Sequence, residues 1–382
     1  MNIGKLIERN QCAITGIKDL EPLHQINDFP VFMGCINSQI SQDLVTDMCW
    51  SISRGSGLIQ LSKLIPLETL YPESHGSGGV GRLWEMHHKA FADFINKNAL
   101  PIAVLEVGGA HGILSREYKQ YNNIPWTILE PNPLPVEGCD AKFIKGFFDE
   151  NFKCEDRFDT IVHSHVFEHI YNPDEFMMNL SGNMKAGDKL LFSIPNMQEM
   201  LIRNYTNCIN FEHTIFLTEP YIEYLLAKHG YKLLNKKYFM EDHSIFYFAI
   251  RDLDVKEIPL PKGLYEKNKN IYYDYVDYHK ELIAKLNKEI NKANRPVYLF
   301  GAHVFSQYLI KAGLQVDKIL FILDNDTKKQ GRRLYGTSIN VASPKILIGV
   351  ANPIVIIKAG FYNNEIKAEI LENINDSTQF LE

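Results

Sequence analysis

From Pro101 onward, short apolar runs alternate with amphipathic segments, and this pattern predicts strands and helices in turn. The runs Ile102 to Val107 and Lys189 to Ser193 have the length and composition of buried strands. The segments His111 to Gln120 and Glu219 to His229 fit helices. Strands that alternate with helices are the signature of a doubly wound α/β sheet, so we expect that fold class for the centre of the chain.

The two ends of the chain have different patterns. Residues 1 to about 70 carry short apolar runs such as Phe29 to Met33, which favour a small β-rich module over helices. Arg82 to Asn98 has apolar residues at helical spacing and predicts one helix. From Pro296, a strand, a glycine turn, a helix and a second strand that ends in Asp324 predict another Rossmann-like α/β domain.

A polar segment separates the two α/β domains. Asp252 to Lys262 is charged and contains prolines, as linkers do, and a helix rich in Lys, Glu and Asn follows from about Tyr273 to Ala293. Its charged, exposed character indicates a bridging or surface helix. We therefore divide the chain into an N-terminal module (1–70), a central domain (71–255), a linker with the bridging helix (256–295) and a C-terminal domain (296–382).

Composition narrows the class of protein. At 382 residues, 45% hydrophobic and 23% charged, the chain has ample material for globular domains. Its net charge of −6 argues against a nucleic-acid partner. No apolar run reaches the length of a membrane span, about 20 residues, and the start lacks a signal-peptide pattern, so we expect a cytoplasmic protein without a membrane partner. The cysteines are scattered, with no C-x-x-C pair, and fit reduced thiols.

One glycine-rich turn carries the strongest chemical signal. Glu106 lies in an apolar run that is followed by Gly108, Ala110 and Gly112. The two glycines allow the backbone to approach a cofactor, and Glu130 ends the next apolar run, where a carboxylate can accept hydrogen bonds from two ribose hydroxyls. The alternative is a plain strand-to-helix turn, but the acid favours a nucleoside site.

A second motif narrows the identity of the nucleoside. The run Phe158 to His169 and the E-x-G-x-x-x-G turn resemble the fourth-strand and first-strand motifs of class I S-adenosylmethionine-dependent methyltransferases. The resemblance implies S-adenosylmethionine as cofactor, lined by the turn residues, Glu130 and His165. It also implies adenine contacts at Phe148 and Asp149. For Phe148 the alternative is core packing.

The whole chain resembles the three-part sugar C-methyltransferase family. Its C-terminal match is carried by Tyr298 to His303, Leu323 to Arg332 and Gly336 to Pro344, and its central match by Phe211-Glu212-His213. In that family a zinc-binding module, a methyltransferase domain and a Rossmann-like domain act on nucleotide-linked 4-keto deoxysugars. The resemblance implies such a small-molecule substrate, and we expect a monomer or a weak homo-oligomer.

The Glu-His pair has a chemical rationale. Methylation at a carbon beside a ketone requires removal of a poorly acidic proton, and histidine has its ordinary pKa near the working pH, at about 6.5. The resemblance makes His213 the general base, with Glu212 orienting it or binding a sugar hydroxyl. Tyr71 is expected at the substrate from its position in the family, and Asn196 from its place at the end of a central strand.

The glycine turn of the C-terminal domain allows two interpretations. Gly301 and His303 open its first helix and are assigned a structural role or contact with the nucleotide of the substrate. An NAD site is the alternative. The sequence lacks the second and third glycines that let the backbone approach a pyrophosphate, so we disfavour it.

Metal binding is not expected. The N-terminal zinc module of the family uses two cysteine pairs, whereas this chain keeps Cys12 and has Ser53 and Ser56 at the places of the second pair. Hydroxyls are poor zinc ligands, so we expect a metal-free module. In the central motif Glu168 and His169 fit a helix-capping pair, with no further ligand at suitable spacing.

Two departures from the family leave the acceptor open. Asn210 stands where the family commonly has an aromatic residue, and Glu73 stands where it often has a tyrosine. Replacing phenols changes how an enolate oxygen is stabilised, and we place Asn210 at the substrate. Methylation at oxygen or nitrogen of another small molecule is therefore an alternative. A non-catalytic protein that binds the cofactor or a nucleotide on the same scaffold is another.

Overall fold

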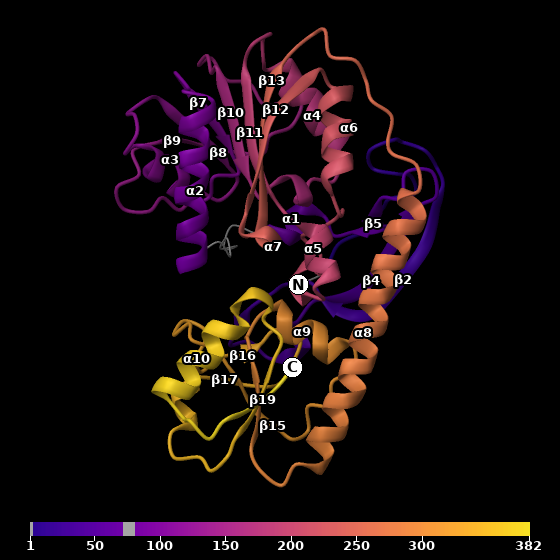
Figure 1. Ribbon diagram of the computed structural model, residues 1–382, viewed down its shortest axis with the longest axis vertical. Coiled ribbons are helices and arrows are strands. Elements are labelled where there is room, and N and C mark those ends of the chain that lie inside the picture. Colours follow the sequence, from indigo (N-terminus) through magenta and orange to yellow (C-terminus); the bar gives the residue numbers. More distant parts are fainter. Residues whose placement is uncertain (1–2, 72–80) are drawn as a thin grey trace.

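The computed structural model describes residues 3–71 and 81–382, and two α/β domains in it are connected along one side by a long helix (Figure 1). A small β module lies beside this helix. Glu73, one of the two departures from the family, lies outside the described residues.

The central domain is built on a mostly parallel sheet with the strand order β12-β13-β11-β10-β7-β8-β9. Helices α2 and α3 lie on one side of this sheet, and α4 and α6 on the other (Figure 1). The first strand, β7, lies in the middle beside β10, and β12 and β13 form an antiparallel edge. This arrangement confirms the doubly wound fold class. The elements are α2 (Arg82–Asn98), β7 (Val104–Val107), α3 (Ile113–Tyr118), β8 (Trp126–Glu130), β9 (Lys142–Lys145), β10 (Thr160–Ser164), η2 (Phe167–His169), α4 (Pro173–Gly182), β11 (Lys189–Pro195), α5 (Met197–Ile202), η3 (Thr206–Cys208), α6 (Glu219–Lys228), β12 (Tyr231–Phe239), α7 (Met240–His243) and β13 (Ser244–Arg251).

The middle strands of this sheet are apolar because helices cover both of its faces. Every residue of β7 is buried, as are all but the last residue of β10 and all but the first of β11. The strand order reverses between β7 and β10, and ligands of doubly wound folds bind at the carboxyl ends of the strands at such a point. These ends point toward the C-terminal domain (Figure 1).

The N-terminal module is β-rich, as its apolar runs predict. Strands β2, β4 and β5 form an antiparallel sheet, and Trp50 and Ile52 of β4 are fully buried. Its elements are β1 (Ile7–Glu8), β2 (Leu20–Pro30), β3 (Cys35–Ile36), η1 (Ile40–Gln42), β4 (Val45–Ser53), β5 (Ile59–Leu61), β6 (Lys63–Leu64) and α1 (Leu67–Leu70). The Sγ atom of Cys12 lies 3.2 Å from Oγ of Ser56, and the Ser53 hydroxyl donates to Asp19. These side chains satisfy one another, and a metal-free module stays a prediction.

The long helix α8 (Leu264–Lys292) begins earlier than its polar sequence suggests. Its first turns are fixed by Asn268, whose amide donates to the carbonyl of Gly57 and to the hydroxyl of Tyr221. One face of α8 is buried, with Tyr272 and Leu286 among its apolar residues. The helix is therefore bridging, as expected, but exposed on one face only.

The C-terminal domain is a parallel sheet with the strand order β17-β15-β14-β18-β19, again with its first strand in the middle. Its elements are β14 (Val297–Phe300), α9 (Val304–Lys311), β15 (Ile319–Leu323), β16 (Arg333–Leu334), β17 (Val341–Ala342), η4 (Pro344–Leu347), β18 (Ile354–Ile357), η5 (Gly360–Tyr362), α10 (Asn363–Asn373) and β19 (Gln379–Leu381). None of the helices in the described ranges combines the length and apolar character that crossing a membrane requires.

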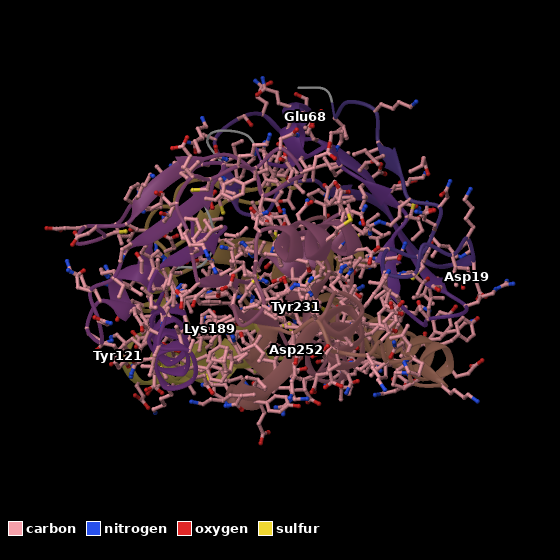
Figure 2. All side chains as sticks on the ribbon, turned by 90° about the horizontal axis from the view of Figure 1, so that it is seen from above. Asp19, Glu68, Tyr121, Lys189, Tyr231 and Asp252 are labelled. Carbon is pink, nitrogen blue, oxygen red and sulfur yellow. The ribbon has the colours of Figure 1, made fainter. Side chains whose placement is uncertain are left out.

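The N-terminal module is attached to the C-terminal domain by a contact that the sequence does not signal. Strand β3 pairs antiparallel with β16. Arg333 donates to both carboxylate oxygens of Asp43 at 2.6 Å, and the Asp43 side chain is 2% exposed. When the molecule is seen from above, Asp19 of the N-terminal module and Tyr121 of the central domain lie at opposite edges (Figure 2).

Candidate active site

The glycine turn after β7 lies at the switch point of the central sheet. Glu130, at the end of β8, accepts hydrogen bonds from the backbone N–H of Ala110 at 3.0 Å and of Asn132 at 3.0 Å. Its carboxylate is thus fixed against the turn. Each oxygen keeps acceptor capacity for a further donor, such as a ribose hydroxyl.

The glycines of this turn are required by its conformation and packing. Gly108 and Gly112 have φ of 70° and 69°. A Cβ atom at Gly108 would lie 2.6 Å from Val166, and one at Gly112 would lie 2.3 Å from Cys139. Ala110 also adopts positive φ, at 40°, where a side chain is strained. The sequence pattern therefore marks a turn held close to its neighbours.

Glu106 lies beneath this turn. Its side chain accepts a hydrogen bond of 2.7 Å from the indole of Trp126 and is buried. Burial raises the pKa of Glu106 to about 7. The structure therefore places Glu106 as a support under the turn, and contact with the cofactor stays a prediction.

The remaining cofactor candidates occupy different surroundings. Phe148 packs against Phe152 and Phe176 of the core, which is the alternative given above. Asp149 is exposed and accepts from the N–H of Asn151. His165 has φ of 52° and hydrogen-bonds through Nε2 to Ser244 at 2.8 Å. Of the three, His165 is held most firmly near the switch point.

The predicted base His213 follows the short helix η3 on a tightly bonded turn. The side-chain oxygen of Asn210 accepts from the N–H groups of Glu212 and His213 at 2.9 and 2.8 Å. The Nδ1 atom of His213 lies 3.2 Å from the Cys208 carbonyl oxygen and 3.2 Å from the Asn210 amide nitrogen. Burial lowers the pKa of His213 to about 4, so the ring is neutral at pH 7.

A second histidine lies beside His213 and belongs to a segment far away in the sequence. His169 of η2 meets His213 edge to face, with ring centroids 5.3 Å apart. Its Nδ1 atom lies 3.0 Å from the Tyr71 hydroxyl and 3.7 Å from Glu212. The fold thus brings Tyr71, Glu212 and His213 together, as predicted, and adds His169.

Glu168 does not serve the capping role expected of it. Its side chain is 1% exposed and lies 3.3 Å from His165 Nδ1 and 3.7 Å from His169 Nε2. Burial raises the pKa of Glu168 to about 7. The carboxyl group therefore faces the two histidines and not the start of a helix.

Two residues predicted at the substrate, Asn196 and Asn210, bond the protein itself, and contact with the substrate stays a prediction for both. Asn210 is buried, and its amide nitrogen donates to the carbonyl of Asn207, so both ends of the side chain are used in the turn. Asn196 caps α5, and its amide donates to the carbonyl of Glu241 at 2.7 Å. Short polar side chains at a strand end or before a turn often bond the local backbone, and here this local role prevails.

Gly301 and His303 lie at the turn after β14, as expected. Gly301 has φ of 101°. The N–H of Ala302 donates to Asp324 at 2.9 Å, and Lys329 contacts the same carboxylate oxygen at 3.0 Å. Burial lowers the pKa of His303 to about 4. A contact with the substrate stays a prediction for both residues.

An aromatic and histidine cluster near the cofactor turn escaped the sequence reasoning. The Trp84 ring lies 4.8 Å from His165 and 5.3 Å from His243, and His87 contacts the same group. His243 in turn meets Phe361 of the C-terminal domain, with centroids 5.1 Å apart. The spacing Trp84-x-x-His87 on α2 is a signal that could have indicated it.

The strand order, the turn at the switch point and the acid at the end of β8 define a class I methyltransferase fold. Two family models then identify its parts: a methyltransferase domain matches residues 83–236, and a C-methyltransferase C-terminal domain matches residues 265–381. The protein is therefore an S-adenosylmethionine-dependent methyltransferase with an additional C-methyltransferase C-terminal domain. No curated protein sequence matches the chain.

Solved structures with similar folds include several methyltransferases. Magnesium protoporphyrin IX methyltransferase of Synechocystis PCC 6803, with bound S-adenosylhomocysteine, is 13% identical over 46% of this chain and 90% of its own, with a TM-score of 0.36. The 1,6-didemethyltoxoflavin-N1-methyltransferase of Burkholderia thailandensis is 14% identical over 44% and 79%, with a TM-score of 0.36. The N-methyltransferase NodS of Bradyrhizobium japonicum WM9 is 13% identical over 44% and 97%, with a TM-score of 0.34. Similarity at this level says nothing about the acceptor.

Proposed function

We propose that this enzyme methylates a carbon beside the carbonyl group of a nucleotide-linked deoxysugar, with His213 as general base. The observation that carries the proposal is the position of His213: a neutral imidazole on a rigid turn, beside Glu212 and His169. The match to a C-methyltransferase C-terminal domain supports carbon as the methylated atom.

In this proposal His213 acts as the tautomer whose Nδ1–H is donated to the carbonyl of Cys208. The Nε2 lone pair then takes the proton from the carbon next to the ketone. The electron pair of that C–H bond forms the new bond to the methyl carbon, and the methyl–sulfur bond breaks, which leaves S-adenosylhomocysteine. The lowered pKa keeps the imidazole neutral at working pH but makes it a weaker base than an ordinary histidine, so the proposal relies on fixed geometry for alignment.

Two acceptor-side groups suit the carbonyl oxygen and the sugar. The Tyr71 hydroxyl lies 3.0 Å from His169, so it can stabilise negative charge that develops on an oxygen nearby. Burial raises the pKa of Glu212 to about 7, and its carboxyl group can bond a sugar hydroxyl. Tyr71 and Glu212 therefore place hydrogen-bonding groups beside His169, whose ring meets that of His213.

Exchange of the substrate proton tests the base directly. The probe is a thymidine-diphosphate-linked 4-keto-6-deoxyhexose in deuterium oxide with S-adenosylhomocysteine bound. Wild-type protein should exchange the proton next to the ketone, and His213→Asn should lose the exchange by at least about 100-fold, the lower range for a general base. His229→Asn, which removes the surface partner of Asp174, is the matched control.

The product identifies the methylated atom. With a 13C-labelled methyl donor, the NMR shift of the product methyl group distinguishes a methyl on carbon from one on oxygen or nitrogen. Unchanged exchange in His213→Asn would remove His213 from the mechanism, and a product methylated at oxygen would contradict C-methylation.

A further inference from the structure

Three side chains with metal-binding chemistry come together on the acceptor side of the central domain. Glu168, His169 and His213 each offer one ligand atom, and these atoms all lie within 4.8 Å of one another. Glu168 Oε1 and His169 Nε2 are 3.7 Å apart. Two ligands of a tetrahedral ion at about 2.0–2.1 Å stand about 3.4 Å apart, so only small side-chain rotations are needed.

The carboxyl group of Glu168 supplies a second and independent indication. It is 1% exposed, and within the described part of the chain neither oxygen has a hydrogen-bond partner. A buried carboxyl group without donors is costly, and buried charges in proteins are paired or coordinate metals. Its neighbours are the rings of His165 at 3.3 Å and His169 at 3.7 Å. Glu168 is therefore directed at a place where a cation would satisfy it.

The two histidines are oriented as metal ligands usually are. A ligating imidazole binds the ion through one nitrogen while a second group fixes the other nitrogen. In His169, Nδ1 lies 3.0 Å from the Tyr71 hydroxyl, so Nε2 is the atom that faces Glu168. In His213, Nδ1 lies 3.2 Å from the carbonyl of Cys208 and directs Nε2 away from it.

We propose that Glu168, His169 and His213 form a binding site for one divalent ion of the zinc class, and that this ion switches the enzyme off. Two imidazoles and one carboxylate suit Zn²⁺ better than the oxygen-seeking Mg²⁺ or Ca²⁺. A tetrahedral ion has four ligand positions, and these three side chains fill three of them. The proposed inhibition rests on the proposed function. The ion binds the Nε2 lone pair of His213, and the same lone pair must accept the substrate proton.

This site differs from the degenerate zinc module at the N-terminus. There Cys12 hydrogen-bonds to Ser56, and Ser53 donates a hydrogen bond to Asp19, so these side chains have partners within the module. Zinc found in purified protein would therefore have to be located by substitution. Cys12→Ala serves as the matched control because it removes the one cysteine that the module keeps at a zinc-ligand position of the family.

The test is a titration of the chelator-treated, full-length protein with Co²⁺, which replaces Zn²⁺ and absorbs visible light when held by few ligands. One equivalent should produce the absorption, and Zn²⁺ should abolish it by displacement. His169→Ala and Glu168→Gln should each weaken Co²⁺ binding by at least about 100-fold, while Cys12→Ala keeps it. Unchanged affinity for S-adenosylhomocysteine shows that the variants are folded.

Absence of the band, or a band that survives in both His169→Ala and Glu168→Gln, would overturn the metal site. Inhibition is measured separately: Zn²⁺ should lower methyl transfer by wild-type protein, and a chelator should restore it. Full activity with bound Co²⁺ or Zn²⁺ would contradict the switch. The Co²⁺ absorption is measured without a methyl acceptor. It therefore tests the metal site even if the proposed methylation reaction is wrong.

Discussion

The central and C-terminal domains build the same turn, with an acid at the end of the second strand that fixes the glycine turn after the first. Glu130 accepts from the N–H groups of Ala110 and Asn132. Asp324 accepts from those of Ala302 and Asp326 in the same way, at 2.9 Å each. The acid is therefore a structural part of both turns, whatever ligand either domain binds.

The two turns differ in the charged side chains that contact the acid. Asp324 forms an ion pair with Lys329 at 3.0 Å, which neutralises its charge and uses acceptor capacity of one carboxylate oxygen. Among the described residues, no cation is paired with Glu130. We infer from this difference that an acid at this position indicates a nucleoside site only where its oxygens keep acceptor capacity that the protein does not use.

Removal of the two acids should therefore affect cofactor binding very differently. Glu130→Ala loses charge-assisted hydrogen bonds to two ribose hydroxyls, each worth about 1.5–3 kcal/mol, so affinity for S-adenosylhomocysteine should fall about a thousandfold. Asp324→Ala should leave that affinity within about twofold, since its carboxylate serves the turn and Lys329. Calorimetry measures both. Equal losses in the two variants would break the comparison.

Asp43 offers a test of how much the contact between the N-terminal module and the C-terminal domain contributes to stability. The bidentate Arg333–Asp43 pair is almost fully enclosed, and removing one partner of a buried pair leaves an uncompensated charge, at a cost of about 3 kcal/mol. Asp43→Ala should lower the free energy of unfolding by that amount in urea. Asp47→Ala, on strand β4 of the same module, is the control because Asp47 bonds Gln25 and not Arg333. A change below about 0.5 kcal/mol would show that the Arg333–Asp43 pair does not stabilise the interface.

The N-terminal module also contacts the central domain, through Arg9. Its guanidinium donates to the carbonyls of Thr214 at 3.0 Å and Tyr171 at 2.6 Å, next to His213 and close to His169. Lysine keeps the charge but cannot span both carbonyls. Arg9→Lys should lower kcat about tenfold without changing the affinity for S-adenosylhomocysteine, in steady-state assays against the control Arg54→Lys. Loss of cofactor affinity instead would show a general loss of structure.

Lowering the pH should destabilise the central domain before it destabilises the C-terminal domain. Burial lowers the pKa of His165 and His243 to about 3 and that of His213 to about 4. Below about pH 6.5 the unfolded chain binds protons that these rings exclude, so stability falls as pH falls from about 6.5 toward 4. The raised pKa values of Glu106 and Glu212 act in the opposite direction and offset part of this loss.

Hydrogen exchange near pH 5 measures this order. Amides of β10 and β11 should lose protection before those of β14 and β18, where His303 is the comparable buried histidine. Simultaneous loss in both sheets would show that the histidines of the central domain do not decide its acid stability.

The sequence predicts the elements of both α/β domains well because apolar runs and helical spacing are local signals. The helix expected from Arg82 to Asn98 has these bounds in the structure, and the segment Glu219 to His229 extends one residue beyond α6. It fails where contacts are made between distant segments. The pairing of β3 with β16 involves strands too short to carry a pattern, and Asp43 and Arg333 meet only through the fold.

The candidate site shows the same division. Tyr71, Glu212 and His213 meet as the family resemblance implied. Asn210, expected at the substrate, bonds the backbone of its own turn, and Asn196 caps α5 and donates to the distant carbonyl of Glu241. A sequence offers no means to separate these uses of a polar side chain from contact with a substrate. His213 joins Glu168 and His169 from another segment, and no local pattern reveals this meeting.

The stoichiometry of cofactor binding tests the central claim, that one of two similar turns holds the cofactor. Calorimetric titration of the full-length protein with S-adenosylhomocysteine should give one site per chain, and titration with NAD should give none. A second S-adenosylhomocysteine site, or binding of NAD, would contradict the account, as would a complete lack of S-adenosylhomocysteine binding.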